Sequence, residues 1–229
     1  MKVITIIIVF FFTINAFSQL AVVNDADGYV NVRYKADKNS KVISKLLNNE
    51  VVFCFEPAGN WVNIDYKKNN SDLSGYVYKD RVRLLSALQT IKVVESTNNW
   101  LKFSADSVSV LLQTSKFVSI QQKLKYKKNS GSRYLDKING KHFYGTDGEI
   151  PKFMYKRILV VVGRDTLKIP AAEYNDLYEP NLSSTNLNYD SKIHRYYLSA
   201  MNGDGAGGYE VVWVFDKTKY LRRYIYNGF

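Results

Sequence analysis

The chain has 229 residues, of which 46% are hydrophobic, and a formal net charge of +11 at neutral pH. This length accommodates two modest domains, and the single cysteine, Cys54, excludes an intramolecular disulfide, so stability must come from packed cores. Within the apolar run V-V-F-C-F, Cys54 is expected to be a small buried hydrophobe and not a nucleophile.

Residues 1–18 have the layout of a secretory signal peptide. A lysine gives a positive start, an apolar run occupies 3–12, and the small residues Ala16 and Ser18 stand three and one positions before a cleavage point ahead of Gln19. The apolar run is shorter than the about 20 residues of a membrane-spanning helix, although a retained anchor is the alternative. We therefore expect an exported protein, periplasmic or extracellular, with no transmembrane anchor after cleavage.

Residues 19–85 are expected to form a small β-barrel. Short alternating or apolar runs, bounded by Asn, Gly, Ser or Lys, indicate its strands. The runs are Y-V-N-V-R (29–33), V-I-S-K-L (42–46), E-V-V-F-C-F (50–55), N-W-V-N-I-D-Y (60–66) and G-Y-V-Y (75–78).

The order of these phrases resembles the bacterial SH3-like domain. The matching phrases are Asn31-Val32-Arg33, Val42-Ile43 with Leu46, Gly59-Asn60-Trp61-Val62 and Gly75-Tyr76-Val77. The resemblance covers about 60 of the 229 residues. It implies a partly open barrel of five or six strands that binds cell-wall peptides or serves as an interaction module. The chain departs from the family pattern in the loop 34–38, and in 67–74, which we expect to be a long loop.

Aromatic residues and one arginine are the candidate ligand-binding residues of this barrel. Tyr29, Tyr34, Trp61 and Tyr76 offer rigid surface with polar tips, which suits a peptide or a glycan. Arg33 can pair bidentately with a carboxylate of a wall peptide. The alternative is that Trp61 and Tyr76 simply complete the barrel core.

Residues 86–97 are expected to be a connector with one strand at 91–95, and residues 98–229 a second β-rich domain. Its strands are predicted at 100–103, 108–112, 117–121, 156–162 and 166–169, followed by a meander at 193–200, 209–215 and 220–226. Gly163-Arg164-Asp165 is expected to form a hairpin turn. One short helix is predicted at 171–177.

Most of the positive charge lies in the second domain. Residues 19–100 carry 11 basic and 9 acidic side chains, whereas residues 101–229 carry 20 and 12, a net of +8. Most of this excess lies between Lys116 and Lys141. Such a patch attracts polyanions, which outside the cytoplasm include cell-wall carboxylates, lipopolysaccharide phosphates and acidic polysaccharides. The alternative is a solvated face that lysines keep soluble.

The second domain lacks the catalytic residues of the hydrolases that often accompany SH3-like modules. Residues 101–229 contain no cysteine nucleophile, and the two histidines, His142 and His194, are not part of an H-E-x-x-H motif. A G-x-S-x-G serine elbow is also absent. We therefore predict no catalytic residue, no metal and no cofactor. A hydrolase with paired carboxylates is an alternative, because such pairs need no fixed spacing.

The most distinctive local phrase is N-G-D-G-A-G-G-Y-E at 202–210, which we expect to be a tight hairpin loop. A strand and not a helix follows it, which argues against a phosphate loop, and it lacks the carboxylates of a calcium loop. Residues 144–151 and 176–179 could converge on it. If Asp147, Asp176 and Asp204 meet there, they would form a polar or metal site, so Asp147 and Asp204 join the candidate ligand-binding residues.

These observations predict an exported, non-enzymatic protein whose SH3-like module binds a cell-envelope component, either a peptidoglycan peptide or another anionic wall polymer. One alternative is an inhibitor or immunity-type protein that binds an exported enzyme, for which the basic charge suits an acidic target. Another is a carboxylate-dependent glycan hydrolase. Nucleic acid is not an expected partner, because export removes the protein from it.

Overall fold

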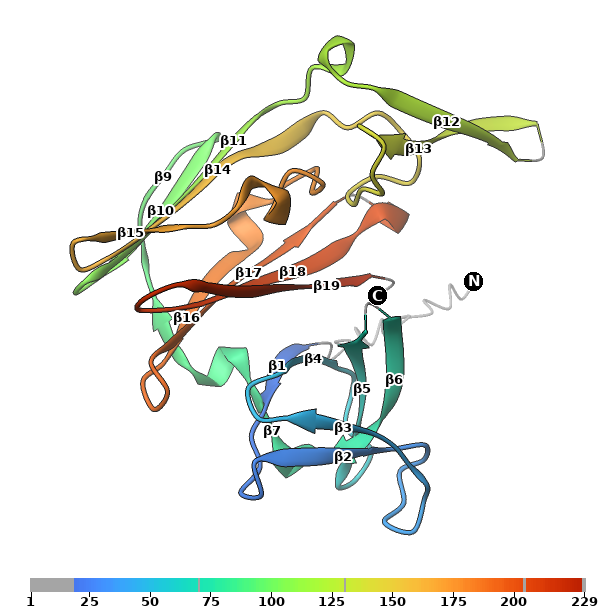
Figure 1. Ribbon diagram of the computed structural model, residues 1–229, viewed down its shortest axis with the longest axis vertical. Coiled ribbons are helices and arrows are strands. Elements are labelled where there is room, and N and C mark those ends of the chain that lie inside the picture. Colours follow the sequence, from blue (N-terminus) through green and yellow to red (C-terminus); the bar gives the residue numbers. More distant parts are fainter. Residues whose placement is uncertain (1–18, 70, 130, 204, 228–229) are drawn as a thin grey trace, which may run out of the picture.

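The computed structural model describes residues 19–69, 71–129, 131–203 and 205–227, and within them the protein is mainly β, as predicted (Figure 1). A curled, half-barrel sheet is followed by a second β-rich part and a projecting hairpin. The predicted signal peptide, residues 1–18, lies outside the described residues. None of the helical turns in the described ranges has the length and apolarity needed to cross a membrane.

The curled sheet has seven strands in the order β3-β2-β6-β5-β4-β1-β7. Their bounds are β1 Gln19–Val23, β2 Tyr29–Arg33, β3 Val42–Leu47, β4 Val51–Cys54, β5 Trp61–Lys68, β6 Ser71–Tyr78 and β7 Val82–Leu84. Alternate residues such as Val32, Ile64 and Val77 face inward and form its core. Cys54 belongs to this core, which confirms the prediction that it is buried, and burial raises the pKa of its thiol to about 12.

The predicted long loop at 67–74 is wrong. Strands β5 and β6 stay paired as far as Lys68 and Ser71, so residues 67, 68 and 71–74 belong to strands. Asn69 has a positive φ of 51°, a conformation that Asn adopts more readily than most residues. An ion pair between Lys67 and Asp72, which are cross-strand partners, supports the outer end of this hairpin.

Gly75 lies where β6 passes close to β2. A Cβ added at this position would lie 2.5 Å from Val32 Cγ1 and 3.0 Å from the carbonyl oxygen of Arg33. We expect Gly75→Ala to lower the free energy of unfolding by about 1–3 kcal/mol, because relief of the crowding requires a backbone shift. Urea unfolding measures this loss. Ser74→Ala, at the exposed neighbouring position, is the control, and equal stability of the two variants would contradict the close approach.

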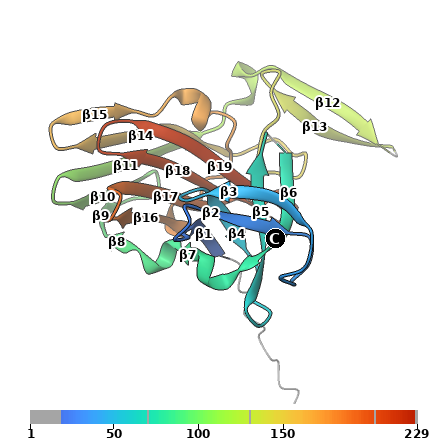
Figure 2. The ribbon, with the colours of Figure 1, turned by 60° about the horizontal axis from the view of Figure 1, so that its bottom comes forward.

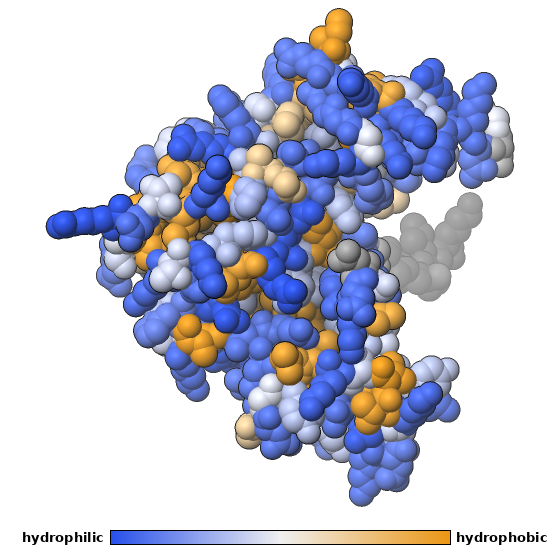
Figure 3. Space-filling model, in the orientation of Figure 1, coloured by the Kyte–Doolittle hydropathy of each residue, from blue (hydrophilic) through white to orange (hydrophobic). Residues whose placement is uncertain are grey.

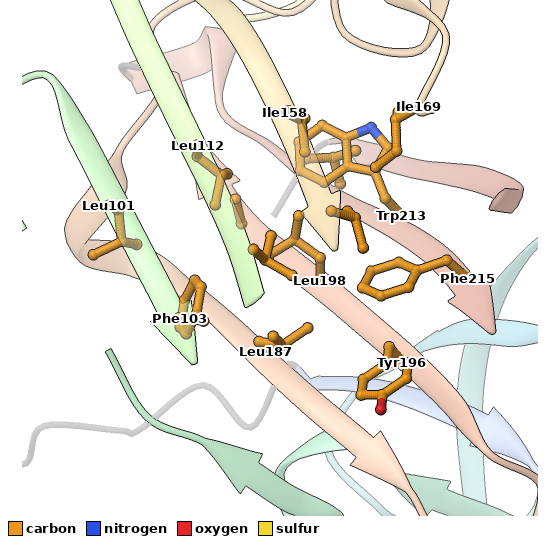
Figure 4. Packing of buried hydrophobic residues seen from close by; sticks show 14 of the residues in the cluster. Leu101, Phe103, Leu112, Ile158, Ile169, Leu187, Tyr196, Leu198, Trp213 and Phe215 are labelled. Atoms are coloured by element: carbon orange, nitrogen blue, oxygen red, sulfur yellow. The ribbon is translucent and has the colours of Figure 1, made fainter. Parts of the chain in front are cut away.

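The second part of the chain is a sandwich of two antiparallel five-stranded sheets, in the orders β15-β14-β11-β10-β9 and β19-β18-β17-β16-β8. The first sheet contains β9 Val93–Ser96, β10 Trp100–Ala105, β11 Val108–Lys116, β14 Phe153–Val162 and β15 Asp165–Lys168. The second, here called the central sheet, contains β8 Gln89–Ile91, β16 Thr185–Asp190, β17 Arg195–Asn202, β18 Tyr209–Asp216 and β19 Tyr220–Asn227. Figure 4 shows Leu112 and Ile158 of the first sheet packed towards Leu198, Trp213 and Phe215 of the central sheet.

The remaining elements are one hairpin and six short 3-10 turns within the described residues. The hairpin pairs β12 Leu124–Asn129 with β13 Ser132–Ile138, and it projects from the sandwich in Figure 1. The turns are η1 Lys79–Arg81, η2 Leu85–Ala87, η3 Ser119–Gln121, η4 Ala171–Glu173, η5 Leu182–Ser184 and η6 Gly205–Gly207.

The predicted meander and the predicted Gly163 hairpin are confirmed, whereas three local predictions are wrong. The connector forms two short strands, β8 and β9, one at the edge of each sheet, and not one strand at 91–95. The predicted strand at 117–121 is the turn η3, because no described strand pairs with this segment and Ile120 stays 93% exposed. The predicted helix at 171–177 is only η4, because Leu177 instead bridges to Tyr144 in parallel.

The curled sheet packs directly against the outer face of the central sheet (Figure 2). The buried residues of this contact are Val22, Val51, Phe53, Leu85 and Leu88 on one side and Tyr197, Val212, Val214, Tyr224 and Tyr226 on the other. The Tyr226 hydroxyl donates a hydrogen bond of 2.7 Å to the carbonyl of Val51. Because β17 and β18 are thus covered on both faces, the sequence V-V-W-V-F of β18 is apolar at consecutive positions.

Candidate functional site

A basic pocket of about 490 Å³, here called the junction pocket, lies where the β5–β6 hairpin meets β19. Its lining residues are Lys67, Lys68, Asn69, Tyr144, Arg222, Arg223, Tyr224 and Ile225. Four of these are cations and none is acidic. The pocket draws on both parts of the fold, because two of the cations come from the curled sheet and two from the central sheet.

Acidic neighbours compensate two of the four positive charges. Arg223 makes a bidentate contact with Asp176, with Nη1–Oδ1 and Nη2–Oδ2 distances of 2.6 and 3.0 Å. Burial alone would lower the pKa of Arg223, but the hydrogen bonds to Asp176 raise it overall. Lys67 pairs with Asp72 at the pocket edge. Asp176 therefore holds the Arg223 side chain in place and neutralises its charge, so Arg223 lines the pocket but is not a free cation.

The other two cations have only neutral hydrogen-bond partners among the described residues. Lys68 Nζ donates to Ser44 Oγ at 3.0 Å, and Arg222 Nη1 donates to the hydroxyl of Tyr224 at 3.1 Å. The hydrogen bond to Tyr224 raises the pKa of Arg222. Lys68 and Arg222 form no ion pair with a described carboxylate, and only the more distant Glu50 contributes a negative charge that acts on Arg222. Cations without an ion-pair partner can bind an anion.

The predicted barrel residues lie on the outer surface of the curled sheet and not in its core. Trp61 stacks on its cross-strand partner Tyr78, with ring centroids 4.0 Å apart, and Tyr76 is the strand partner of Arg33. The alternative in which Trp61 and Tyr76 complete the core is thus wrong, because both belong to the outward-facing, half-buried positions of β5 and β6.

The remaining barrel candidates are engaged in different ways. Arg33 Nη1 donates a hydrogen bond of 2.7 Å to the carbonyl oxygen of Ser40, so its guanidinium group supports the loop 34–40. Tyr34, in that loop, is 65% exposed. Tyr29 lies at the opposite end of β2, where Lys45 Nζ is 3.2 Å from the centre of its ring. Arg33, Tyr76 and Trp61 lie on the neighbouring strands β2, β6 and β5, whereas Tyr29 lies at the far end of β2.

The backbone segments expected to converge on the glycine-rich loop do so. Gly207 is so close to Thr146 that an added Cβ would lie 2.6 Å from its Cα, and the amide of Gly203 donates to the carbonyl of Glu179. The carboxylates do not form the predicted cluster: Asp147 is exposed in another pocket, and Asp176 binds Arg223. Asp204 lies outside the described residues. In the described ranges, no three His, Cys, Asp or Glu side chains are placed to hold a metal ion.

The lysine-rich region is largely the β12–β13 hairpin. Its surface is strongly hydrophilic in Figure 3, and only Lys127 of its lysines forms an ion pair, with Asp136, among the described residues. Arg133 stacks over the ring of Tyr126 at 3.9 Å. This hairpin adds a long-range positive field to the protein. Its exposed lysines agree with the alternative interpretation, in which this region is a solvated face.

Sequence reasoning missed the junction pocket. Its signal was the pair of basic doublets, Lys67-Lys68 and Arg222-Arg223, each next to an aromatic residue of a strand, but the doublets are more than 150 residues apart. Comparison with known proteins adds no assignment, since no family model, curated protein or solved structure matches this chain.

Proposed function

We propose that this is an exported, non-enzymatic binding protein of the cell envelope, in which an SH3-like module and the β-sandwich together hold an anionic polymer in the junction pocket. The observation that supports this most directly is that Lys68 and Arg222, one from each part of the fold, form no ion pair with a described residue. Arg222 presents a planar guanidinium, which matches carboxylate and phosphate groups, and Lys68 adds a flexible point charge.

The size and construction of the pocket fit this role. A volume of about 490 Å³ accommodates a short segment of a polymer, such as one or two charged units, and not a globular partner. The buried contact between the curled sheet and the central sheet holds the two cations at a fixed separation. Preorganisation of this kind reduces the entropy lost on binding. The basic β12–β13 hairpin would speed the encounter with the polymer by long-range attraction.

Binding to purified peptidoglycan and to polygalacturonate, a soluble carboxylate polymer, tests the proposal. We expect the double variant Lys68→Gln/Arg222→Gln to bind at least about tenfold more weakly, because each charged hydrogen bond contributes about 1.5–3 kcal/mol. The matched control is Lys125→Gln/Lys128→Gln, which removes the same formal charge from the exposed hairpin.

Affinities are measured by co-sedimentation and by calorimetry at low and at physiological salt. Retention of the control variant together with loss of the pocket variant supports the junction pocket. Equal losses in the two variants would show that net charge alone causes binding, and failure of the native protein to bind either polymer at low salt would refute the proposed function.

A further inference from the structure

A second pocket lies at a corner of the central sheet that the curled sheet leaves uncovered. Its volume is about 440 Å³, and we call it the Glu210 pocket. Its lining residues are Gln19, Leu20, Leu85, Ser86, Thr90, Ser184, Asn186, Asn188, Ser199, Ala200, Met201 and Glu210. Val212 and Val214, the next residues of β18 on the same face, are covered by the curled sheet. The pocket thus begins where the apolar contact ends.

Among the described residues that line this pocket, Glu210 alone has a titratable side chain. Its Oε2 atom is buried and has no hydrogen-bond partner among the described residues. Burial raises the pKa of the carboxyl group to about 7, and no neighbouring charge contributes to that shift. A buried carboxylate without a partner is costly, so the position is suited to a ligand that supplies the missing donor.

Two further polar side chains lie beside Glu210 without partners of their own. Asn186 and Ser199 are register partners on β16 and β17, and neither side chain forms a hydrogen bond with a described residue. Glu210 is on the next strand, opposite Met201. Ser199 pairs with Val212, so Glu210 lies two residues further along the strand. Neighbouring strands are about 4.8 Å apart and a strand rises about 3.4 Å per residue, so the three backbone positions extend over roughly 12 Å, and their side chains bring the three groups within reach of one small polyol. Leu20 and Leu85 supply apolar walls.

We propose that the Glu210 pocket binds a small hydroxylated amine, whose ammonium group contacts Glu210 and whose hydroxyl groups contact Asn186 and Ser199. An ammonium carries three donors and a full charge, and it would neutralise the one charge that the lining residues contain. A neutral polyol would leave that charge uncompensated, and an anion would be repelled by it. This site is separate from the junction pocket and prefers the opposite charge, so it does not depend on the proposed function.

Glucamine and sorbitol are the probes, because they differ only in an amine in place of one hydroxyl group. At pH 8 we expect glucamine to bind at least about tenfold more tightly than sorbitol, with NMR shift changes at Ser199 and Met201. At pH 5.5, where Glu210 is protonated, the advantage of glucamine should disappear. Glu210→Gln should remove the same advantage at pH 8, whereas the exposed control Glu149→Gln should retain it.

A further variant, Ser199→Ala, leaves Glu210 unchanged and should weaken the binding of both probes by a similar factor. The same spectra report whether each variant is folded. The proposal is overturned if sorbitol binds as tightly as glucamine at pH 8, if Glu210→Gln keeps the preference for the amine, or if neither probe shifts the pocket resonances of the native protein.

Discussion

Replacement of Arg83 by Met is expected to lower the free energy of unfolding by about 3–5 kcal/mol. Arg83, in β7 of the curled sheet, forms an ion pair with Asp190 at the end of β16, and the Asp190 side chain is only 2% exposed. Removal of the arginine leaves a buried carboxylate without its counter-charge, which costs far more than the loss of a surface pair. Urea unfolding, followed by fluorescence and by circular dichroism, measures the change.

The control for this variant is Lys102→Met. Lys102 pairs with Glu95 on the surface, where both side chains are well exposed, so its loss should cost less than about 1 kcal/mol. The double variant Arg83→Met/Asp190→Asn should recover part of the stability, because it removes the stranded charge and keeps the oxygen that accepts from the amide of Lys192. A loss for Arg83→Met no larger than that of Lys102→Met would contradict a structural role for the buried pair.

The strands of the curled sheet could be predicted because alternation of apolar and polar residues is a local signal. In β5, for example, Val62, Ile64 and Tyr66 alternate with outward-facing polar residues, and all three are buried. The same reasoning failed at 117–121, where Val118 and Ile120 alternate in the same way but have no neighbouring strand. Periodicity indicates that a segment can form a strand, whereas a partner strand decides whether it does.

The contact between the two parts of the fold could not be predicted from local pattern. Val22, Phe53 and Tyr226 are far apart in the sequence, and each belongs to a short apolar run that fits a single-layer core equally well. The run V-V-W-V-F in β18 was the one direct sign, because a strand apolar at consecutive positions must be covered on both faces. That pattern does not show which segment covers the strand.

The candidate sites show the same limit. Asp147, Asp176 and Asp204 were grouped because segments 144–151 and 176–179 were expected to converge on the glycine-rich loop, and both segments do lie next to it. A convergent backbone does not make the side chains converge, and the carboxylate of Asp176 faces Arg223 instead. Lys68 and Arg222 could be paired only with knowledge of how the two parts pack.

Two pockets of opposite character therefore border one apolar contact. The described residues that line the junction pocket, beside β19, include four cations and no acid. Those that line the Glu210 pocket, at the end of β18, include one carboxylate and no cation. Each draws residues from the curled sheet and from the central sheet. A variant that loosens the contact, such as Arg83→Met, should therefore weaken ligand binding at both pockets, whereas a variant within one pocket should affect that pocket alone.

Glu210→Gln is expected to stabilise the protein at pH 8 by about 3 kcal/mol and to have almost no effect at pH 4. The folded pKa of Glu210 is about 7, raised from an ordinary value of 4.5 by burial. Below pH 4.5 the group is protonated in both the folded and the unfolded state, so it contributes nothing. Between pH 4.5 and 7 the unfolded chain loses its proton first, and native stability falls as the pH rises.

Above pH 7 the full cost of the buried charge is present in the native protein and absent from Glu210→Gln. Unfolding curves at pH 4, 6 and 8 measure the difference, with Glu56→Gln as an exposed control that should give no trend of this kind. If Glu210→Gln stabilised the protein equally at pH 4 and pH 8, the fall in native stability with rising pH would not come from Glu210. A bound amine should act in the opposite direction, since it stabilises the charged form, and saturating glucamine should therefore reduce the fall in native stability between pH 4.5 and 7.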